Sequence, residues 1–242
     1  LRRGRAHRMS GSGDTRPGAV RLRPASARAR SSRDGIVAVE AFSRGDAIDR
    51  AWMGWGALRV LSRQDWVPGA VRDEGRVANM ERLLLVLDGA LDADCGDLGR
   101  HRVSAGGSLW ISTGHGLASR LGNASKDAPL RLLEAWLQPD RVNAVPAVAP
   151  HPPPGATLVD LEPGMPVAIP ACAGGRWWLE VLAGEVIACG GADAPPTTDV
   201  SHGTRLSAGD GLGWLAGDVD APASVAASGG GPARLLLLAL PA

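Results

Sequence analysis

Tyrosine is absent from this 242-residue chain, phenylalanine occurs once (Phe42), and Lys126 is the single lysine among 26 basic residues. Cysteine is almost as scarce: Cys95, Cys172 and Cys189 lie far apart, and no C-x2-C pair occurs. This odd number and wide spacing exclude a disulfide framework and a local cysteine zinc site. We therefore expect free thiols in a reducing compartment.

Long apolar segments are also missing. No run approaches the roughly 20 residues that span a bilayer, and no apolar core follows the basic start, so we expect neither a signal peptide nor a membrane partner. The five histidines show no H-x-H or H-x3-H spacing and so give no local metal motif. These absences together predict a cytoplasmic protein.

The net charge of +1 conceals a basic N-terminal segment. Residues 1–33 contain ten arginines, with Asp14 as the only acid. Such a segment can bind nucleic acid or anionic lipid, but its Gly/Ser/Arg-rich composition without an apolar stripe is more typical of a disordered arm. We predict disorder over 1–33 and do not expect a nucleic-acid partner.

What the chain has in quantity is glycine (33), proline (18) and hydrophobic residues (45%), a mixture that favours short strands and tight turns. The alternating IVAVEAF (36–42) and the apolar run ERLLLVLDGAL (81–91), closed by Asp-Gly, predict strands. RHRVSAGGSLWIS (100–112) predicts two strands around a Gly-Gly turn, and PLRLLEAWLQPD (129–140) predicts a closing strand.

The same pattern returns after a proline-rich segment. Residues 139–155 contain six prolines, which cannot pair into a sheet, so we place a linker there. TRLSAGDGLGWL (204–215) then matches VSAGGSLWI (103–111), and ARLLLLALP (233–241) closes the chain as 129–140 closes its first half. We predict an all-β fold of two tandem jelly-roll barrels, at 34–138 and 156–242, packed face to face.

Several motifs resemble the pirin family of bicupins, which includes bacterial quercetinase-like proteins. MGWGALRV (53–60) resembles the family's Met-Gly-Phe-Gly-x-Leu-Arg-Val, and NMERLLLVLDGAL (79–91) its Asp-Met-Glu-Ile…Val-Leu-Glu-Gly-x-Leu. STGHGLASRLGN (112–123) is similar to its segment with His-Ser-Glu, and EAWLQPD (134–140) to the strand that ends the first cupin. The resemblance runs from about residue 34 to the C-terminus and weakens past the linker. It implies a cupin fold for both domains.

The resemblance also implies a metal site in the first cupin, held by three histidines and a glutamate that suit iron or another divalent metal. At the corresponding positions this chain has Gly75, Val77, Ser119 and Leu121. All four ligands are replaced. We therefore expect no metal cofactor, and a pocket lined by small and apolar groups or filled by them.

Residues beside the four implied ligand positions are further candidates to line the pocket. If side chains alternate across the strands, Ser119 and Leu121 face one side and Arg120 the other, and Gly75 and Val77 share a face. Most of the eight tryptophans are expected in the core. The possible pocket-lining residues are Glu81, Trp110, His115, Arg120 and Trp136, although His115 lies between two glycines, as an exposed turn residue would.

Three functions stay open at this point. The first is a non-catalytic or metal-independent pirin-like protein, predicted to be a monomer, that binds a small molecule or a protein partner and has no catalytic residue. The second, which the resemblance implies, is a quercetin 2,3-dioxygenase-like oxygenase. The third is a metal-free cupin that performs acid/base chemistry with Arg120, His115 or Glu81.

Overall fold

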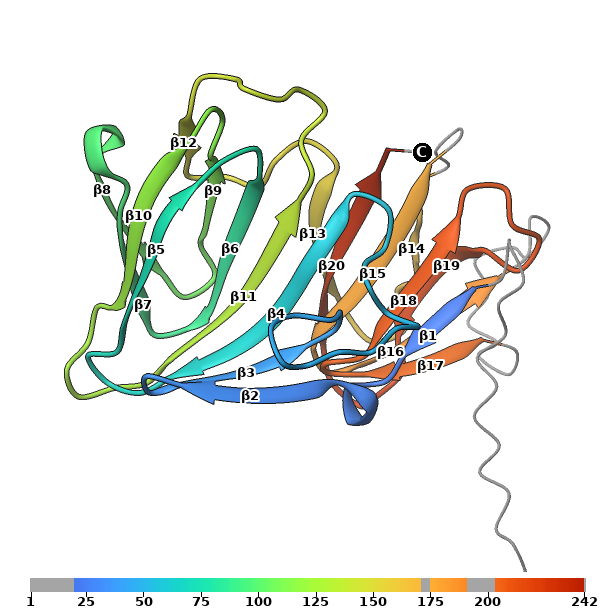
Figure 1. Ribbon diagram of the computed structural model, residues 1–242. Helices are drawn as coiled ribbons and strands as arrows, with labels where there is room; N and C mark the ends of the chain where they lie inside the picture. Colours follow the sequence, from blue (N-terminus) through green and yellow to red (C-terminus); the bar gives the residue numbers. More distant parts are fainter. Residues whose placement is uncertain (1–19, 171–174, 191–202, 242) are drawn as a thin grey trace, which may run out of the picture.

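A computed structural model describes residues 20–170, 175–190 and 203–241 (Figure 1). The regular secondary structure of these ranges is β-strand, apart from two 3-10 turns, η1 (Ala25–Ala27) and η2 (Gly96–Leu98). None of the helices they contain is long and apolar enough to cross a membrane. The predicted all-β fold with two barrels is confirmed.

The first barrel is formed by a seven-stranded and a four-stranded antiparallel sheet. Their strand orders are β12-β9-β6-β11-β4-β3-β2 and β5-β10-β7-β8. The strands are β2 (Ala29–Arg33), β3 (Ile36–Glu40), β4 (Leu58–Trp66), β5 (Val71–Val77), β6 (Glu81–Asp88), β7 (Ala90–Asp94), β8 (Arg100–Ser104), β9 (Ser108–Ser112), β10 (Leu117–Asn123), β11 (Leu130–Leu137) and β12 (Ala147–Ala149).

The second barrel repeats this arrangement. Its sheets run in the orders β1-β18-β15-β20-β13 and β14-β19-β16-β17, so β18-β15-β20-β13 corresponds to β9-β6-β11-β4. The predicted internal duplication is therefore confirmed. The strands are β1 (Arg21–Arg23), β13 (Ala156–Leu161), β14 (Val167–Ala168), β15 (Arg176–Ala183), β16 (Glu185–Gly190), β17 (Thr204–Ser207), β18 (Gly211–Leu215), β19 (Pro222–Ala227) and β20 (Ala233–Leu240).

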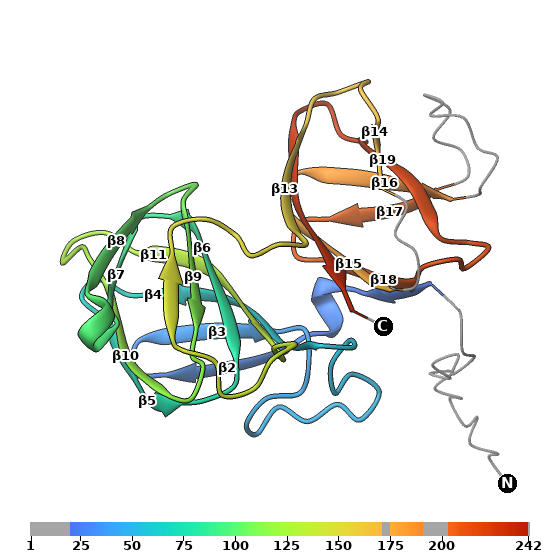
Figure 2. The same ribbon diagram turned by 90° about the horizontal axis from the view of Figure 1, so that it is seen from above.

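The predicted disorder of 1–33 is wrong for residues 20–33, whereas residues 1–19 lie outside the described residues. β1 pairs with β18 of the second barrel, and β2 pairs with β3 of the first, so this segment joins both barrels (Figure 2). Its arginines are partly structural. The Arg28 guanidinium donates two hydrogen bonds to Glu180, of 2.6 and 2.8 Å, and both side chains are only 1% exposed.

The linker also contributes a strand. Ala147–Ala149 forms β12 and pairs with β9, which contradicts the expectation that 139–155 stays outside the sheets. Prolines at 146 and 150 flank this strand, and it lies at the edge of the sheet, where a missing N–H donor is tolerated. The first strand after the linker, β13, begins at Ala156.

The large sheets of the two barrels share one hydrophobic core. Alternate residues of β6 and β20 point to opposite sides, so Leu84 and Leu235 fill their own barrels while Leu83 and Leu236 pack between them. This explains why both strands read as continuous apolar runs. The shared core also contains Phe42, Trp52, Trp55, Leu58, Leu61, Leu133, Trp178, Leu182, Leu238 and Leu240.

Trp55 makes two close contacts with the second barrel. The Trp55 indole donates a 2.8 Å hydrogen bond to the Trp177 carbonyl oxygen. Its ring lies against the backbone of Gly213, where an added Cβ would come within 2.8 Å of it. Six of the eight tryptophans are buried, as expected for core residues, and Trp110 and Trp136 are half-buried.

The shared core predicts that the second barrel does not fold alone. Expressed as residues 156–242, it lacks β1 and exposes Trp178, Leu236 and Leu238 to water. We expect no cooperative thermal transition by near-ultraviolet circular dichroism. Co-expression with residues 1–155 should restore a soluble complex of the two fragments. Cooperative, monomeric melting of 156–242 by itself would show that the interface is dispensable.

Candidate functional site

Strand β10 carries two of the four positions that the resemblance assigns to metal ligands. Ser119 and Leu121 are buried and face the barrel interior, while Arg120 between them is exposed on the outer face. Leu117 pairs with Val77, and Leu121 pairs with Arg72. Paired residues share a face of the sheet, so Val77 and Arg72 also point inward.

The fourth position, Gly75, does not face the barrel interior. A bulge interrupts the pairing of β5 with β10 at this point, and Gly75 occupies it with φ +60° and open space around it. The extra residue shifts the alternation, so that the Glu74 side chain, 8% exposed, takes the inward position. The expectation that Gly75 and Val77 share a face is therefore wrong.

A buried ion pair fills the space beside Ser119. Arg82 on β6 is 0% exposed and donates a 2.6 Å hydrogen bond to Glu134 on β11. The same guanidinium donates to the Ser119 hydroxyl oxygen at 3.1 Å and lies 3.2 Å from a Glu74 carboxylate oxygen. Trp136 packs against it, with 4.7 Å between the guanidinium carbon and the indole centroid.

The Glu134 carboxylate also accepts hydrogen bonds from Arg72 and Gln64. Arg72 on β5 donates to Glu134 at 2.8 Å and also pairs with Glu74. The Gln64 amide on β4 donates to Glu134 at 2.9 Å, and its oxygen accepts from Arg72 at 2.9 Å. Arg44 lies 3.8 Å from Glu134. Three arginines and three glutamates (Arg44, Arg72, Arg82, Glu40, Glu74 and Glu134) thus form what we call the arginine–glutamate network.

The surroundings inside the network shift the pKa values of two of its carboxyl groups in opposite directions. Burial alone would raise the pKa of Glu134, but Arg72, Arg82 and Arg44 outweigh burial and hold this pKa well below its usual range. Glu40 lies at the edge of the network, where burial outweighs the attraction of Arg44 and the Ser62 hydrogen bond and raises the pKa of its carboxyl group. Glu134 is therefore a fixed anion, and Glu40 is the carboxylate that is poorly compensated.

The space beside Ser119 is thus charged, although the rest of the barrel interior is apolar, and this corrects the expected lining of small and apolar groups only. The residues that sequence reasoning missed are Glu40, Arg44, Gln64, Arg72, Glu74 and Glu134. Alternation along the strands could have placed two network residues inside the barrel. Arg82 is two residues from the inward Leu84, and Glu134 is two residues from the inward Leu132, so each shares that residue's side of its strand. The partners of these two residues come from distant strands and depend on closure of the barrel.

Four of the five expected pocket-lining residues, Glu81, Trp110, His115 and Arg120, lie outside the barrel interior. Glu81 accepts hydrogen bonds from the Trp110 indole at 2.6 Å and from the Ser112 hydroxyl at 2.8 Å, on the face opposite to Arg82. His115 is exposed in its turn, as its glycine neighbours suggest. Trp136 is the exception, because its ring lies in the barrel beneath Arg44 and Arg82.

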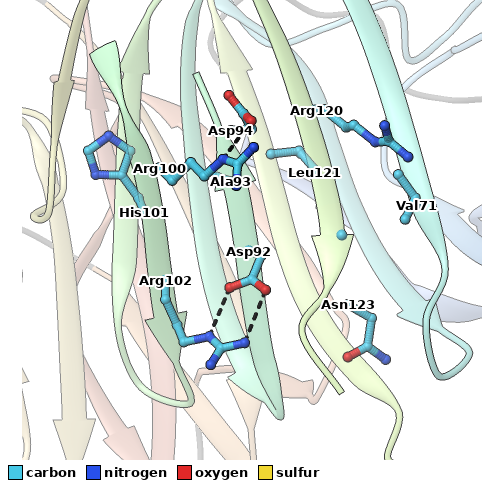
Figure 3. Close-up of a pocket in the computed structure, with 11 residues that line it drawn as sticks. Val71, Asp92, Ala93, Asp94, Arg100, His101, Arg102, Arg120, Leu121 and Asn123 are labelled. Carbon is cyan, nitrogen blue, oxygen red and sulfur yellow. Dashed lines mark hydrogen bonds and ion pairs between the residues drawn. The ribbon is translucent and has the colours of Figure 1, made fainter. Parts of the chain in front are cut away.

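Arg120 lines a hollow of about 510 Å³ on the outer face of the small sheet (Figure 3). In this hollow Arg102 donates to both Asp92 oxygens, at 2.8 and 3.0 Å, and Arg100 donates to Asp94 at 2.9 Å. These four side chains are 40–87% exposed, so water already satisfies and screens them. The hollow offers no buried unpaired group, and we place the candidate site inside the barrel instead.

The side chains at the implied metal positions do not fit a divalent metal. Val77 and Leu121 offer hydrocarbon, Ser119 already accepts a hydrogen bond from Arg82, and Gly75 faces out. The carboxylates nearby, Glu74 and Glu134, are neutralised by guanidinium groups, which repel a cation. The described ranges contain no cluster of three His, Cys, Asp or Glu residues with metal-ligand geometry. His7, Cys172 and His202 lie outside them.

Sequence comparison finds a relative for part of the chain. No family model matches it. The pirin-like protein YhaK of Escherichia coli K12 is 33% identical over 104 residues, which cover 42% of this chain and 45% of YhaK. The chain thus spans less than half of the curated relative it matches.

Structural comparison extends the likeness to both barrels. The crystal structure of YhhW from Escherichia coli has a TM-score of 0.76 and 22% identity, covering 92% of this chain and 98% of YhhW. YhhW has also been solved as a bacterial pirin in complex with nickel(II). A quercetin 2,3-dioxygenase from Acinetobacter baumannii has a TM-score of 0.65 and 14% identity, covering 92% of this chain and 79% of the enzyme. One segment of this chain is thus similar in sequence to a pirin-like protein, and both of its barrels share the fold of bacterial pirins.

Proposed function

We propose that this protein is a metal-independent pirin that binds a small molecule at the mouth of its first barrel. One observation carries the proposal: the Arg82 guanidinium, fully buried, lies against Ser119 and pairs with Glu134. A cationic side chain fixed against Ser119, one of the expected ligand positions, opposes a divalent ion by repulsion and by occupying the space.

The polar mouth of the barrel supports the binding role. A groove of about 660 Å³ lies between β2, β3 and β5 and reaches Glu40, Arg72 and Glu74 at the edge of the arginine–glutamate network. Its volume is in the range of small-molecule sites, which are about 300–1,000 Å³. Buried polar groups around such a groove fix the orientation of a ligand and discriminate between ligands.

Metal analysis tests this proposal directly. Protein expressed in medium supplemented with iron, nickel, copper and zinc should contain well under one equivalent of any of them by plasma mass spectrometry. YhhW, which binds nickel(II) in its crystal structure, is the matched control when purified in the same way. Added Fe(II) should produce no oxygen uptake with quercetin, because the part of the chain that the structure describes offers no set of imidazole and carboxylate ligands to hold it.

A contrary result has a clear form. Near-stoichiometric metal that is lost on replacing His115 or His101 would overturn the metal-independent proposal. It would favour the quercetin 2,3-dioxygenase-like alternative, which otherwise rests on the resemblance and on fold similarity to the Acinetobacter enzyme. Acid/base chemistry by Glu81, His115 and Arg120 is not supported, because these side chains lie outside the barrel and point to different surfaces.

A further inference from the structure

Two buried carboxylate oxygens of the groove at the mouth of the first barrel lack a hydrogen bond: Glu74 Oε1, which is ion-paired with Arg72 and Arg82, and Glu40 Oε2. Glu40 on β3 is 3% exposed, and its Oε1 accepts a 3.0 Å hydrogen bond from the Ser62 hydroxyl. Its Oε2 has no hydrogen-bond partner among the described residues. A buried carboxylate oxygen without a donor costs free energy, so a ligand that brings a donor is favoured there.

The nearest cation does not close on this oxygen. The Arg44 guanidinium lies 3.7 Å from Glu40 Oε1 and 3.8 Å from Glu134, beyond hydrogen-bond distance from either, and its side chain is 30% exposed. Arg44 belongs to the connection between β3 and β4, in a turn where its backbone pairs with that of Ala47. It lies over the Trp136 ring at 5.4 Å. Arg44 therefore compensates Glu40 weakly and from one side.

The groove as a whole has more acidic than basic side chains. Its lining includes five carboxylates, Asp34, Glu40, Asp46, Asp73 and Glu74, and three guanidinium groups, Arg33, Arg44 and Arg72. Arg72 is already bound to Glu74 and Glu134, and Arg33 is 91% exposed beside Asp34. The potential in a groove lined by an excess of one charge attracts ligands of the opposite charge.

We propose that this groove binds a small organic cation whose ammonium or guanidinium group donates to Glu40 Oε2. This inference rests on the proposed function, because it names the class of ligand for the same barrel mouth. The cationic group forms a charge-assisted hydrogen bond, which is stronger than a neutral one. Ile36 and Ala38, on the same strand as Glu40, offer apolar surface to the carbon chain of the ligand.

Three probes of similar length and different charge test the proposal on the full chain. They are butane-1,4-diamine, butane-1,4-diol and succinate, titrated by calorimetry and followed by NMR through the Trp136 indole. We expect the diamine to bind and the diol and succinate to bind at least about tenfold more weakly, since ~1.4 kcal/mol of interaction separates such affinities.

Two substitutions identify the counter-ion. Glu40→Gln keeps the shape and the acceptor for Ser62 but removes the charge, and should lower diamine affinity at least about tenfold. Arg44→Gln removes the competing cation and should raise the affinity. Glu185→Gln, which changes an exposed carboxylate on the second barrel, is the matched control and should leave the affinity unchanged.

Each remaining outcome overturns the inference. Succinate binding more tightly than the diamine would identify an anion site and leave the metal-independent binding function standing. Diamine binding that is equal in the parent protein and Glu40→Gln would exclude Glu40 as the counter-ion. Absence of diamine binding in the parent protein and in Arg44→Gln would exclude the cation site. Metal content, measured separately, decides the proposed function itself.

Discussion

Replacing Arg28 with methionine should lower the free energy of unfolding by about 3–5 kcal/mol, because it leaves the buried Glu180 carboxylate without its guanidinium partner. The pair joins the N-terminal segment to β15 of the second barrel, with both side chains 1% exposed. Glu180 also accepts a 3.2 Å hydrogen bond from the Trp178 indole. Chemical denaturation monitored by tryptophan fluorescence measures the change.

Two further variants separate the ion pair from the simple loss of a side chain. Arg28→Met with Glu180→Gln removes both charges and keeps an acceptor for Trp178, so it should recover at least ~2 kcal/mol of the loss. Arg131→Met breaks the exposed pair with Asp88, which has an N–O distance of 2.8 Å, and should change stability by less than ~1 kcal/mol. Equal effects at Arg28 and Arg131 would contradict the buried-pair account.

Replacing Glu134 with leucine should be equally severe, at about 3–5 kcal/mol, because the buried Arg82 and the largely buried Arg72 both lose a carboxylate. Adding Arg82→Met to Glu134→Leu removes the stranded charge beside Ser119, and Arg72 keeps Glu74. The double variant should therefore be more stable than Glu134→Leu alone. Urea denaturation of the parent protein and both variants provides the comparison, and a double variant less stable than the single one would contradict it.

Acid should reveal the same network. The pKa of Glu134 is held below its unfolded-state value by its arginine partners. Its contribution to stability is therefore complete above the unfolded pKa of about 4.3 and is lost as the pH falls through the folded pKa. The stability difference between the parent protein and Glu134→Leu should shrink as the pH is lowered below about 4. A constant difference down to pH 3 would exclude this coupling.

Local patterns in the sequence were sufficient for the architecture. The repeated Ser-Ala-Gly turns at 104–106 and 207–209 lie between equivalent strand pairs, β8–β9 and β17–β18. Alternation along β10 placed Ser119 and Leu121 inward and Arg120 outward. These features depend on neighbours a few residues apart, for which backbone geometry and the period of two are enough.

Tertiary structure alone decided what the first barrel contains. The bulge at Gly75 replaces an expected ligand position with Glu74, because one extra residue reverses the alternation of β5. Arg82 and Glu134 are separated by 52 residues, and β1 pairs with a strand 188 to 192 residues later, so neither contact follows from local pattern. The sequence by itself determined two tandem barrels and which residue types stand at the positions that the resemblance assigns to metal ligands. Only closure of the barrel determined that paired charges, rather than apolar side chains, occupy that space, because which side chains meet depends on register between strands far apart in the chain.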